Sequence, residues 1–293
     1  MAEFFKKLFY LITAPIAFIQ NHFKAVLLVL IFALALLFSQ SERQPNLYVI
    51  ELYGEIFDAS EFLANVEKAK AEHVKGVLLV VDSPGGAIAP SVEMMMAVRD
   101  LSRRKPVVAY ASDVMASGSY YASAWANEIV ANPGGLIGSI GVVIEGANMS
   151  KLLDTIGVKI NVVKAGEYKE VGAFYRDPTA AEQAQLESLI EDIYDMFVSD
   201  VAQARGLDVA KSSQFANGRV FTPKQALNAR LIDHLGGINF AKERLIKLSK
   251  VDNPIWNEKS NMEKLLEGVK KEAKLLAADL LTQKIKAKME LNP

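Results

Sequence analysis

The chain has 293 residues, 51% of them apolar, with 33 basic and 34 acidic side chains and a formal net charge of −1. This balance argues against a nucleic-acid-binding protein, which usually carries a basic excess or stripe. There is no cysteine, which excludes disulfides, thiolate metal sites and a cysteine nucleophile. The three histidines (His22, His73 and His234) are too scattered to predict a zinc site. We therefore expect neither a metal nor a cofactor.

The N-terminal region is typical of a membrane anchor. Residues 25–38 are fourteen apolar residues without a charge. As a helix they would span roughly 21 Å, and extension over Phe23 and Ser39, with Lys24 snorkelling, nearly reaches the roughly 30 Å hydrocarbon core. The sequence therefore predicts a transmembrane anchor at 25–40.

Lys6, Lys7 and Lys24 precede this apolar run. The positive-inside rule then places a segment at 1–24 in or on the cytoplasmic face, and the rest of the chain, after a linker at 41–46, on the other side. There are two alternatives, a signal peptide cleaved near Ala33-Leu-Ala35 and a buried soluble helix.

From residue 46 onward, apolar runs of strand length alternate with helical patterns. Such alternation predicts parallel strands covered by helices, an α/β fold. We expect strands at Leu47–Leu52, Val77–Asp82, Pro106–Ala111, Glu128–Ala131, Gly141–Ile144 and Val158–Val163. We expect helices at Ala59–Lys70, Ser91–Arg104, Ser117–Asn127, Met149–Ile156 and 180–206.

Two later features complete the predicted domain at 47–250. Thr222 is a good N-cap for a short helix, because Pro223 would occupy its first position. The chain from 251 to 293 then becomes a lysine-rich amphipathic helix, which would pack on a domain or form a mobile tail.

A glycine-rich turn, Ser83-Pro-Gly-Gly86, directly follows the buried strand at Val77–Asp82. Glycines let backbone N–H groups point into a cavity. The turn could be a simple strand-to-helix connection, but neither phosphate-binding glycine motif is present. The remaining functional use is an oxyanion hole.

Ser117-Gly118 lies where an apolar strand meets an apolar helix. The positive end of a helix dipole stabilises a developing anion there, although most serines in this position are plain N-caps. Ser119 is a neighbouring competitor for a nucleophilic role. No GxSxG elbow is present, which argues against an α/β-hydrolase.

A serine nucleophile needs a proton acceptor, and no histidine has a supporting context. A buried lysine can serve if desolvation keeps it neutral. Lys151, Lys159, Lys164 and Lys169 all lie within reach in the sequence, and spacing alone does not choose among them.

Five motifs occur together in one order between residues 46 and 250. In this order of motifs, the chain resembles the bacterial signal peptide peptidase A family in its short form. The motifs are Val80-Val-Asp-Ser-Pro-Gly-Gly86, Met115-Ala-Ser-Gly-Ser-Tyr-Tyr121, Leu136-Ile-Gly-Ser-Ile-Gly-Val142, Gly166-Glu-Tyr-Lys169 and Gly218-Arg-Val-Phe-Thr-Pro-Lys-Gln-Ala226.

This resemblance implies a ClpP/crotonase-like fold of repeated ββα units and a serine/lysine dyad. By position, Ser117 would be the nucleophile, Lys169 the general base and Ser139 the residue that orients the lysine. The backbone N–H groups of Gly86 (or Gly85) and Gly118 would form the oxyanion hole.

Two residues depart from the family pattern. Ser119 replaces a frequent glycine, and Glu170 follows the lysine where a small residue is common. Glu170 would raise the basicity of the lysine if it faced the amine, although we expect it to point away.

The resemblance further implies an endopeptidase of remnant signal peptides and other apolar peptides. It would be anchored in the bacterial cytoplasmic membrane, with its catalytic domain outside the cytoplasm. Partners would be such peptides, the lipid bilayer and further copies in a homo-oligomeric ring with shared dyads. Two alternatives are a crotonase-like acyl-thioester enzyme and a non-catalytic membrane scaffold on a peptidase fold.

Overall fold

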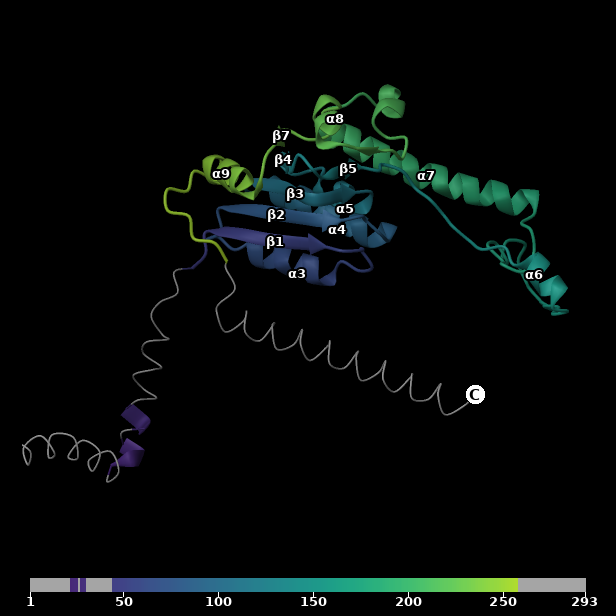
Figure 1. Cartoon of the computed structure of the whole chain (residues 1–293), viewed down its shortest axis with the longest axis horizontal. Coiled ribbons are helices and arrows are strands. Elements are labelled where there is room, and N and C mark those ends of the chain that lie inside the picture. The colour runs from purple at the N-terminus through teal and green to yellow at the C-terminus, as the bar shows by residue number, and fades with distance from the viewer. Residues whose placement is uncertain (1–21, 26, 30–43, 258–293) are drawn as a thin grey trace, which may run out of the picture. The chain divides into compact units, whose positions relative to one another are not determined.

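A computed structural model describes residues 22–25, 27–29 and 44–257 (Figure 1). The chain divides into two units, residues 1–44 and 45–293. In the first unit, residues 23–25 and 27–29 are helical, and most of the predicted anchor at 25–40 lies outside the described residues. Among the residues described, no helix has the length and apolarity needed to cross a membrane. The predicted helix after residue 257 also lies outside them.

The second unit is built on a mixed sheet with the strand order β1-β2-β3-β4-β7. These strands are parallel, whereas β5, which also pairs with β3, pairs with β6 in the antiparallel sense. The strands are β1 (Leu47–Tyr53), β2 (Gly76–Ser83), β3 (Val107–Ala116), β4 (Glu128–Ala131), β5 (Leu136–Gly138), β6 (Val220–Phe221) and β7 (His234–Leu235).

Helices follow most strands, as the alternating pattern predicts. They are α3 (Ser60–Ala69), α4 (Ile88–Ser102), α5 (Gly118–Ser123), α6 (Ser150–Thr155), α7 (Ala180–Arg205), α8 (Pro223–Asn228) and α9 (Ile238–Ser249), with a short 3-10 helix at Val209–Gln214. The predicted cap at Thr222 is confirmed. Thr179 and Thr222 each form a capping box, with Glu182 and Gln225 respectively.

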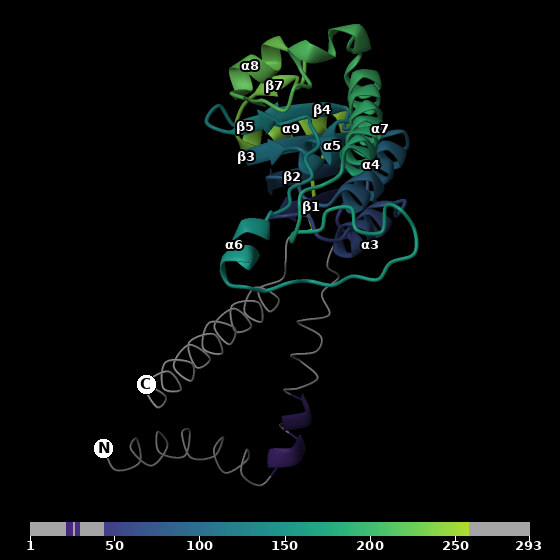
Figure 2. The same ribbon diagram turned by 90° about the vertical axis from the view of Figure 1, so that its right-hand side faces the viewer.

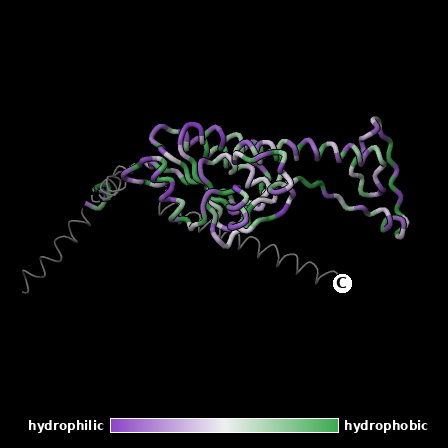
Figure 3. Tube along the Cα trace, turned by 90° about the horizontal axis from the view of Figure 1, so that it is seen from above, coloured by the Kyte–Doolittle hydropathy of each residue, from purple (hydrophilic) through white to green (hydrophobic). Residues whose placement is uncertain are grey.

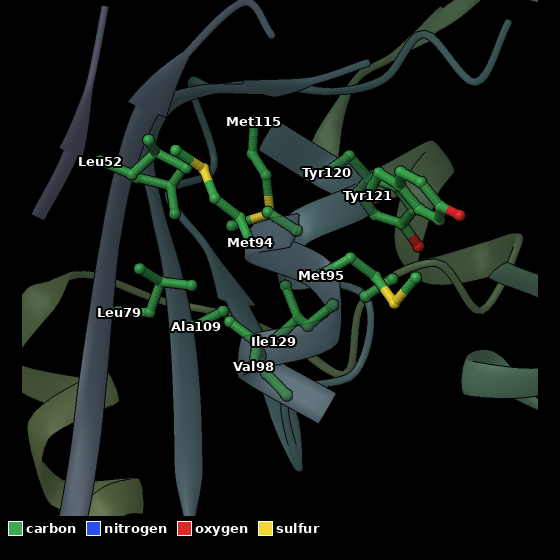
Figure 4. Packing of buried hydrophobic residues seen from close by; sticks show 14 of the residues in the cluster. Leu52, Leu79, Met94, Met95, Val98, Ala109, Met115, Tyr120, Tyr121 and Ile129 are labelled. Atoms are coloured by element: carbon green, nitrogen blue, oxygen red, sulfur yellow. The ribbon is translucent and has the colours of Figure 1, made fainter. Parts of the chain in front are cut away.

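Both faces of the sheet are buried because side chains alternate along each strand. On β2, Leu79 and Val81 join the large core under α3, α4 and α5 (Figure 4), whereas Leu78 and Val80 face α9. Figure 2 shows the same layers from the side. Parallel strands buried on both faces read as continuous apolar runs, which is why β2 is clear in the sequence.

Three sequence predictions are wrong. Residues 141–144 and 158–163 form no strand, and the predicted helix at 117–127 is the short α5, which ends at Ser123. Residues 158–163 are apolar and β-branched, but they have no pairing partner within the described chain, and a strand needs one. The sequence prediction also missed α9.

The segment that contains α6 lies apart from the sheet, beyond the N-terminal end of α7 (Figures 1 and 2). The buried residues of α7 lie mainly in its C-terminal half, from Phe197 to Ala202. We call residues 141–178 the arm. Apolar stretches run along it (Figure 3), and many of its large apolar side chains are exposed.

Candidate active site

Ser117 sits at the junction of β3 and α5 in an unusual backbone conformation. As the N-cap of α5 it has φ 51° and ψ −122°, a region that residues other than glycine rarely adopt. Its N–H donates to the Gly138 carbonyl of β5 at 2.7 Å. Its side chain makes no hydrogen bond within the described structure and is half-buried. The strand-to-helix turn therefore presents the hydroxyl instead of using it as a helix cap.

Two glycines with tight surroundings lie beside Ser117. A Cβ on Gly85 would come within 2.8 Å of the Ser117 Cβ, and one on Gly86 within 2.2 Å of the Ile56 carbonyl oxygen. Both residues also have positive φ, 95° and 155°. A side chain on Gly85 would collide with Ser117 and one on Gly86 with Ile56, so both positions require glycine for this close packing of the turn.

The N–H groups of Gly86 and Gly118 form a candidate oxyanion hole. The Gly86 nitrogen lies 3.5 Å from the position of a Cβ on Gly118. Neither N–H donates a hydrogen bond to any described residue, whereas the Gly85 N–H donates to the Ser83 hydroxyl at 3.2 Å. The geometry therefore favours Gly86 over Gly85 as one of the two donors. Two unsatisfied donors beside a serine can hold a developing oxyanion.

Ser119 is not a competing nucleophile. It is fully buried, and its hydroxyl accepts from the Ala116 N–H at 2.9 Å and donates to the Ser83 carbonyl at 2.6 Å, with the Ala116 carbonyl at 2.9 Å as the alternative acceptor. The hydroxyl joins the start of α5 to the ends of β2 and β3, so it supports the turn that holds Ser117.

We expect Ser119→Ala to lower the free energy of unfolding by about 1–3 kcal/mol, because it removes the buried hydrogen bonds of the Ser119 hydroxyl with Ser83 and Ala116. Denaturant unfolding measures this loss. In the folded variant, Ser117 should still react with a serine-directed reagent. Loss of this labelling in folded protein would make Ser119 a candidate nucleophile again.

A cavity of about 100 Å³ opens beside Ser117. Its lining includes Gly86, Ser117 and Gly118 together with the apolar side chains of Met196 and Phe197 from α7. A cavity this small, with apolar side chains in its lining, suits a single apolar side chain. Such a pocket next to a nucleophile would select one residue of a peptide.

Ser139 lies close to Ser117 across two neighbouring strand ends. Ala116 pairs with Gly138, and the Ser139 N–H donates to the Arg219 carbonyl at 2.9 Å. Ser139 also has positive φ, 49°, and a half-buried side chain. The structure therefore brings Ser117, Ser139 and the glycine N–H groups together.

Lys169 is not part of that group within one chain. It lies in the arm, where its side chain is exposed and forms no ion pair or hydrogen bond with the described residues. Lys151 and Lys159 are also exposed arm residues. Lys164, in contrast, is paired with Glu170 at 2.7 Å.

Glu170 points to Lys164 and not to Lys169, as the sequence prediction expects. Its carboxylate also accepts from the Tyr175 hydroxyl at 2.6 Å and from Arg176 at 3.4 Å. Hydrogen bonds from Lys164 and Tyr175 lower the pKa of Glu170 to about 2, and the same contact raises the pKa of Tyr175. Sequence reasoning missed Tyr175 and Arg176, for which no motif exists.

The chain is similar to known proteases. The model described as "Peptidase family S49" matches residues 99–252. A Synechocystis sp. protein named as a protease is 37% identical over 205 residues, which is 69% of this chain and 74% of that protein. An Enterococcus faecium protein named as signal peptide peptidase SppA is 32% identical, over 74% of this chain and 63% of that protein.

Among solved structures, a mutant of the 1510-N membrane-bound stomatin-specific protease superposes with a TM-score of 0.50 at 16% identity. The alignment covers 74% of this chain and 99% of that one. At this identity the likeness concerns the fold alone.

Proposed function

Because this chain belongs to peptidase family S49, the family of signal peptide peptidase A and SohB, we propose that it is a serine endopeptidase with a Ser117–Lys169 dyad. One observation supports the assignment of Ser117 as the nucleophile. Ser117 adopts a strained conformation beside two unsatisfied N–H groups, those of Gly86 and Gly118. A strained serine next to preorganised donors suits acyl transfer.

The chemistry follows from these positions. Neutral Lys169 Nζ takes the proton from Ser117 Oγ as Oγ attacks a peptide carbonyl carbon. The carbonyl oxygen becomes an oxyanion held by the Gly86 and Gly118 N–H groups at the positive end of α5. Lys169 then protonates the leaving amine, and a water activated by Lys169 hydrolyses the acyl-enzyme. The Ser139 hydroxyl would orient the lysine amine.

A neighbouring copy supplies Lys169 in this proposal. Lys169 is exposed on an arm that lies apart from the sheet, and exposed apolar side chains accompany it. Such a surface in a soluble domain suggests burial against a partner. Those side chains are Val143, Ile144, Met149, Leu152, Ile156, Val158, Ile160, Val162, Val163, Tyr168 and Phe174. A ring of copies would bury them and complete each dyad.

The membrane placement belongs to the same proposal. The apolar run at 25–38, preceded by lysines, would anchor the chain in the cytoplasmic membrane with the peptidase domain outside the cytoplasm. Apolar peptides left in the bilayer, such as signal-peptide remnants, then become the substrates. The apolar side chains that line the cavity beside Ser117, such as Met196 and Phe197, suit them.

Covalent labelling tests the nucleophile. Full-length protein treated with a fluorophosphonate should carry one adduct, and peptide mapping should place it on Ser117. An adduct on another serine, or none in protein that cleaves peptides, would overturn the assignment.

A further inference from the structure

The residue directly after Lys169 is at the centre of an ion-pair cluster that the dyad alone does not explain. We name the five residues the Glu170 clasp: Lys164, Glu170, Tyr175, Arg176 and Glu182. The clasp side chains come from both ends of the arm's last turn and from the start of α7. It lies in the segment between Lys164 and Glu182, with Lys169 inside it.

The clasp is well enclosed for a surface cluster. The side chain of Glu170 is 14% exposed and that of Glu182 only 3%. Arg176 donates to both oxygens of Glu182, at 2.8 and 2.7 Å, in the forked geometry that makes arginine–carboxylate pairs strong and directional. Pairs with such geometry hold a backbone in place better than single exposed pairs do.

The clasp connects the turn at 166–173 to a rigid element. Glu182 also accepts from the Thr179 N–H at 2.9 Å, as part of the capping box that begins α7. Because α7 runs from Ala180 to Arg205 and its C-terminal half is packed in the core, the clasp fixes the turn to the body of the domain. Without it, the turn would depend on backbone contacts such as that of the Lys169 N–H with the Gly166 carbonyl.

The clasp also leaves Lys169 available. Glu170 is occupied by Lys164, Tyr175 and Arg176, so it does not pair with Lys169, and Lys164 is removed as a competing amine. Charged neighbours are thus satisfied among themselves, and Lys169 is the amine that the same turn presents to solvent.

We infer that Glu170 and Arg176 are positioning residues for the base of the proposed dyad, and that they hold the turn so that Lys169 reaches the serine it serves. This inference rests on the proposed function. Displacement of a catalytic group by about 1 Å can cost on the order of 10²-fold in rate. The effect should appear in kcat, because neither residue lines the cavity beside Ser117.

The test compares Glu170→Gln with Glu167→Gln in the full-length protein. Glu167 lies in the same turn, is exposed, and its carboxylate has no partner among the described residues. On an apolar peptide amide, we expect Glu170→Gln to lower kcat by about 10- to 100-fold with KM changed less than about two-fold, and Glu167→Gln to match the parent. Arg176→Lys, which keeps the charge but loses the fork, should lower kcat in the same way, and Glu170→Asp should restore part of it.

Three readouts decide the outcome. Equal kcat for Glu170→Gln and Glu167→Gln overturns the inference. A kcat loss in Glu170→Gln and Arg176→Lys that comes with a large fall in Tm, or with loss of assembly, means a structural role and also overturns it. Lys169→Ala distinguishes failure of the proposed dyad from failure of the positioning role. If Lys169→Ala retains activity, the dyad is wrong. If Lys169→Ala is inactive but Glu170→Gln is fully active, only the positioning role is wrong.

Discussion

Replacement of Ser117 by alanine should reduce kcat for peptide cleavage by about 10⁴-fold or more, with almost no change in the free energy of unfolding. The rate falls because the attacking oxygen is lost. Stability is kept because the Ser117 hydroxyl makes no hydrogen bond within the described structure, and the N–H bond to the Gly138 carbonyl does not involve it. Steady-state cleavage of an apolar peptide amide and denaturant unfolding measure the two quantities.

Ser119→Ala is the matched control for this experiment, because the two serines predict opposite phenotypes. The variant at 119 should lose stability and keep its nucleophile, whereas the variant at 117 should keep stability and lose turnover. A Ser117→Ala protein that cleaves peptides within ten-fold of the parent rate would mean that another residue is the nucleophile.

The buried centre of the fold could be predicted from the sequence. Strand β2 is a continuous apolar run because both its faces are covered, and Thr222-Pro223 defines the start of α8 by its own backbone chemistry. Helix α9 was missed although Ile238, Ala241, Leu245 and Leu248 follow helical spacing. The strand predicted at 158–163 failed for the opposite reason, since its residues suit a strand but no pairing partner is present in the described chain.

Some residues of the candidate site could be predicted from the sequence, and others could not. Ser117 and the glycine turn could be located because each follows a strand, and the ends of parallel strands meet at one edge of a sheet. The choice of Gly86 over Gly85 could not be made, since it depends on which N–H the Ser83 hydroxyl already uses. The base could not be chosen by spacing either, because exposed lysines follow one another along the arm, and only the contact with Glu170 distinguishes Lys164.

Because Lys169 lies apart from Ser117 within one chain, we expect two inactive variants to restore activity when they are combined. Ser117→Ala and Lys169→Ala should each be inactive alone, and co-expression of the two should restore activity. In a ring, each site would combine Ser117 of one copy with Lys169 of the next. In an equal mixture, the copy that supplies the serine has an intact Ser117 with a probability of about one half, and the copy that supplies the lysine has an intact Lys169 with the same probability. About a quarter of the sites should therefore work. Two different affinity tags, used in successive purification steps, ensure that only mixed assemblies are assayed.

The control is Ser117→Ala co-expressed with the Ser117→Ala/Lys169→Ala double variant. This mixture contains no intact Ser117 and should stay inactive. If the doubly tagged mixture of single variants is as inactive as this control, each dyad forms within one chain, and the arm must then fold back onto its own sheet.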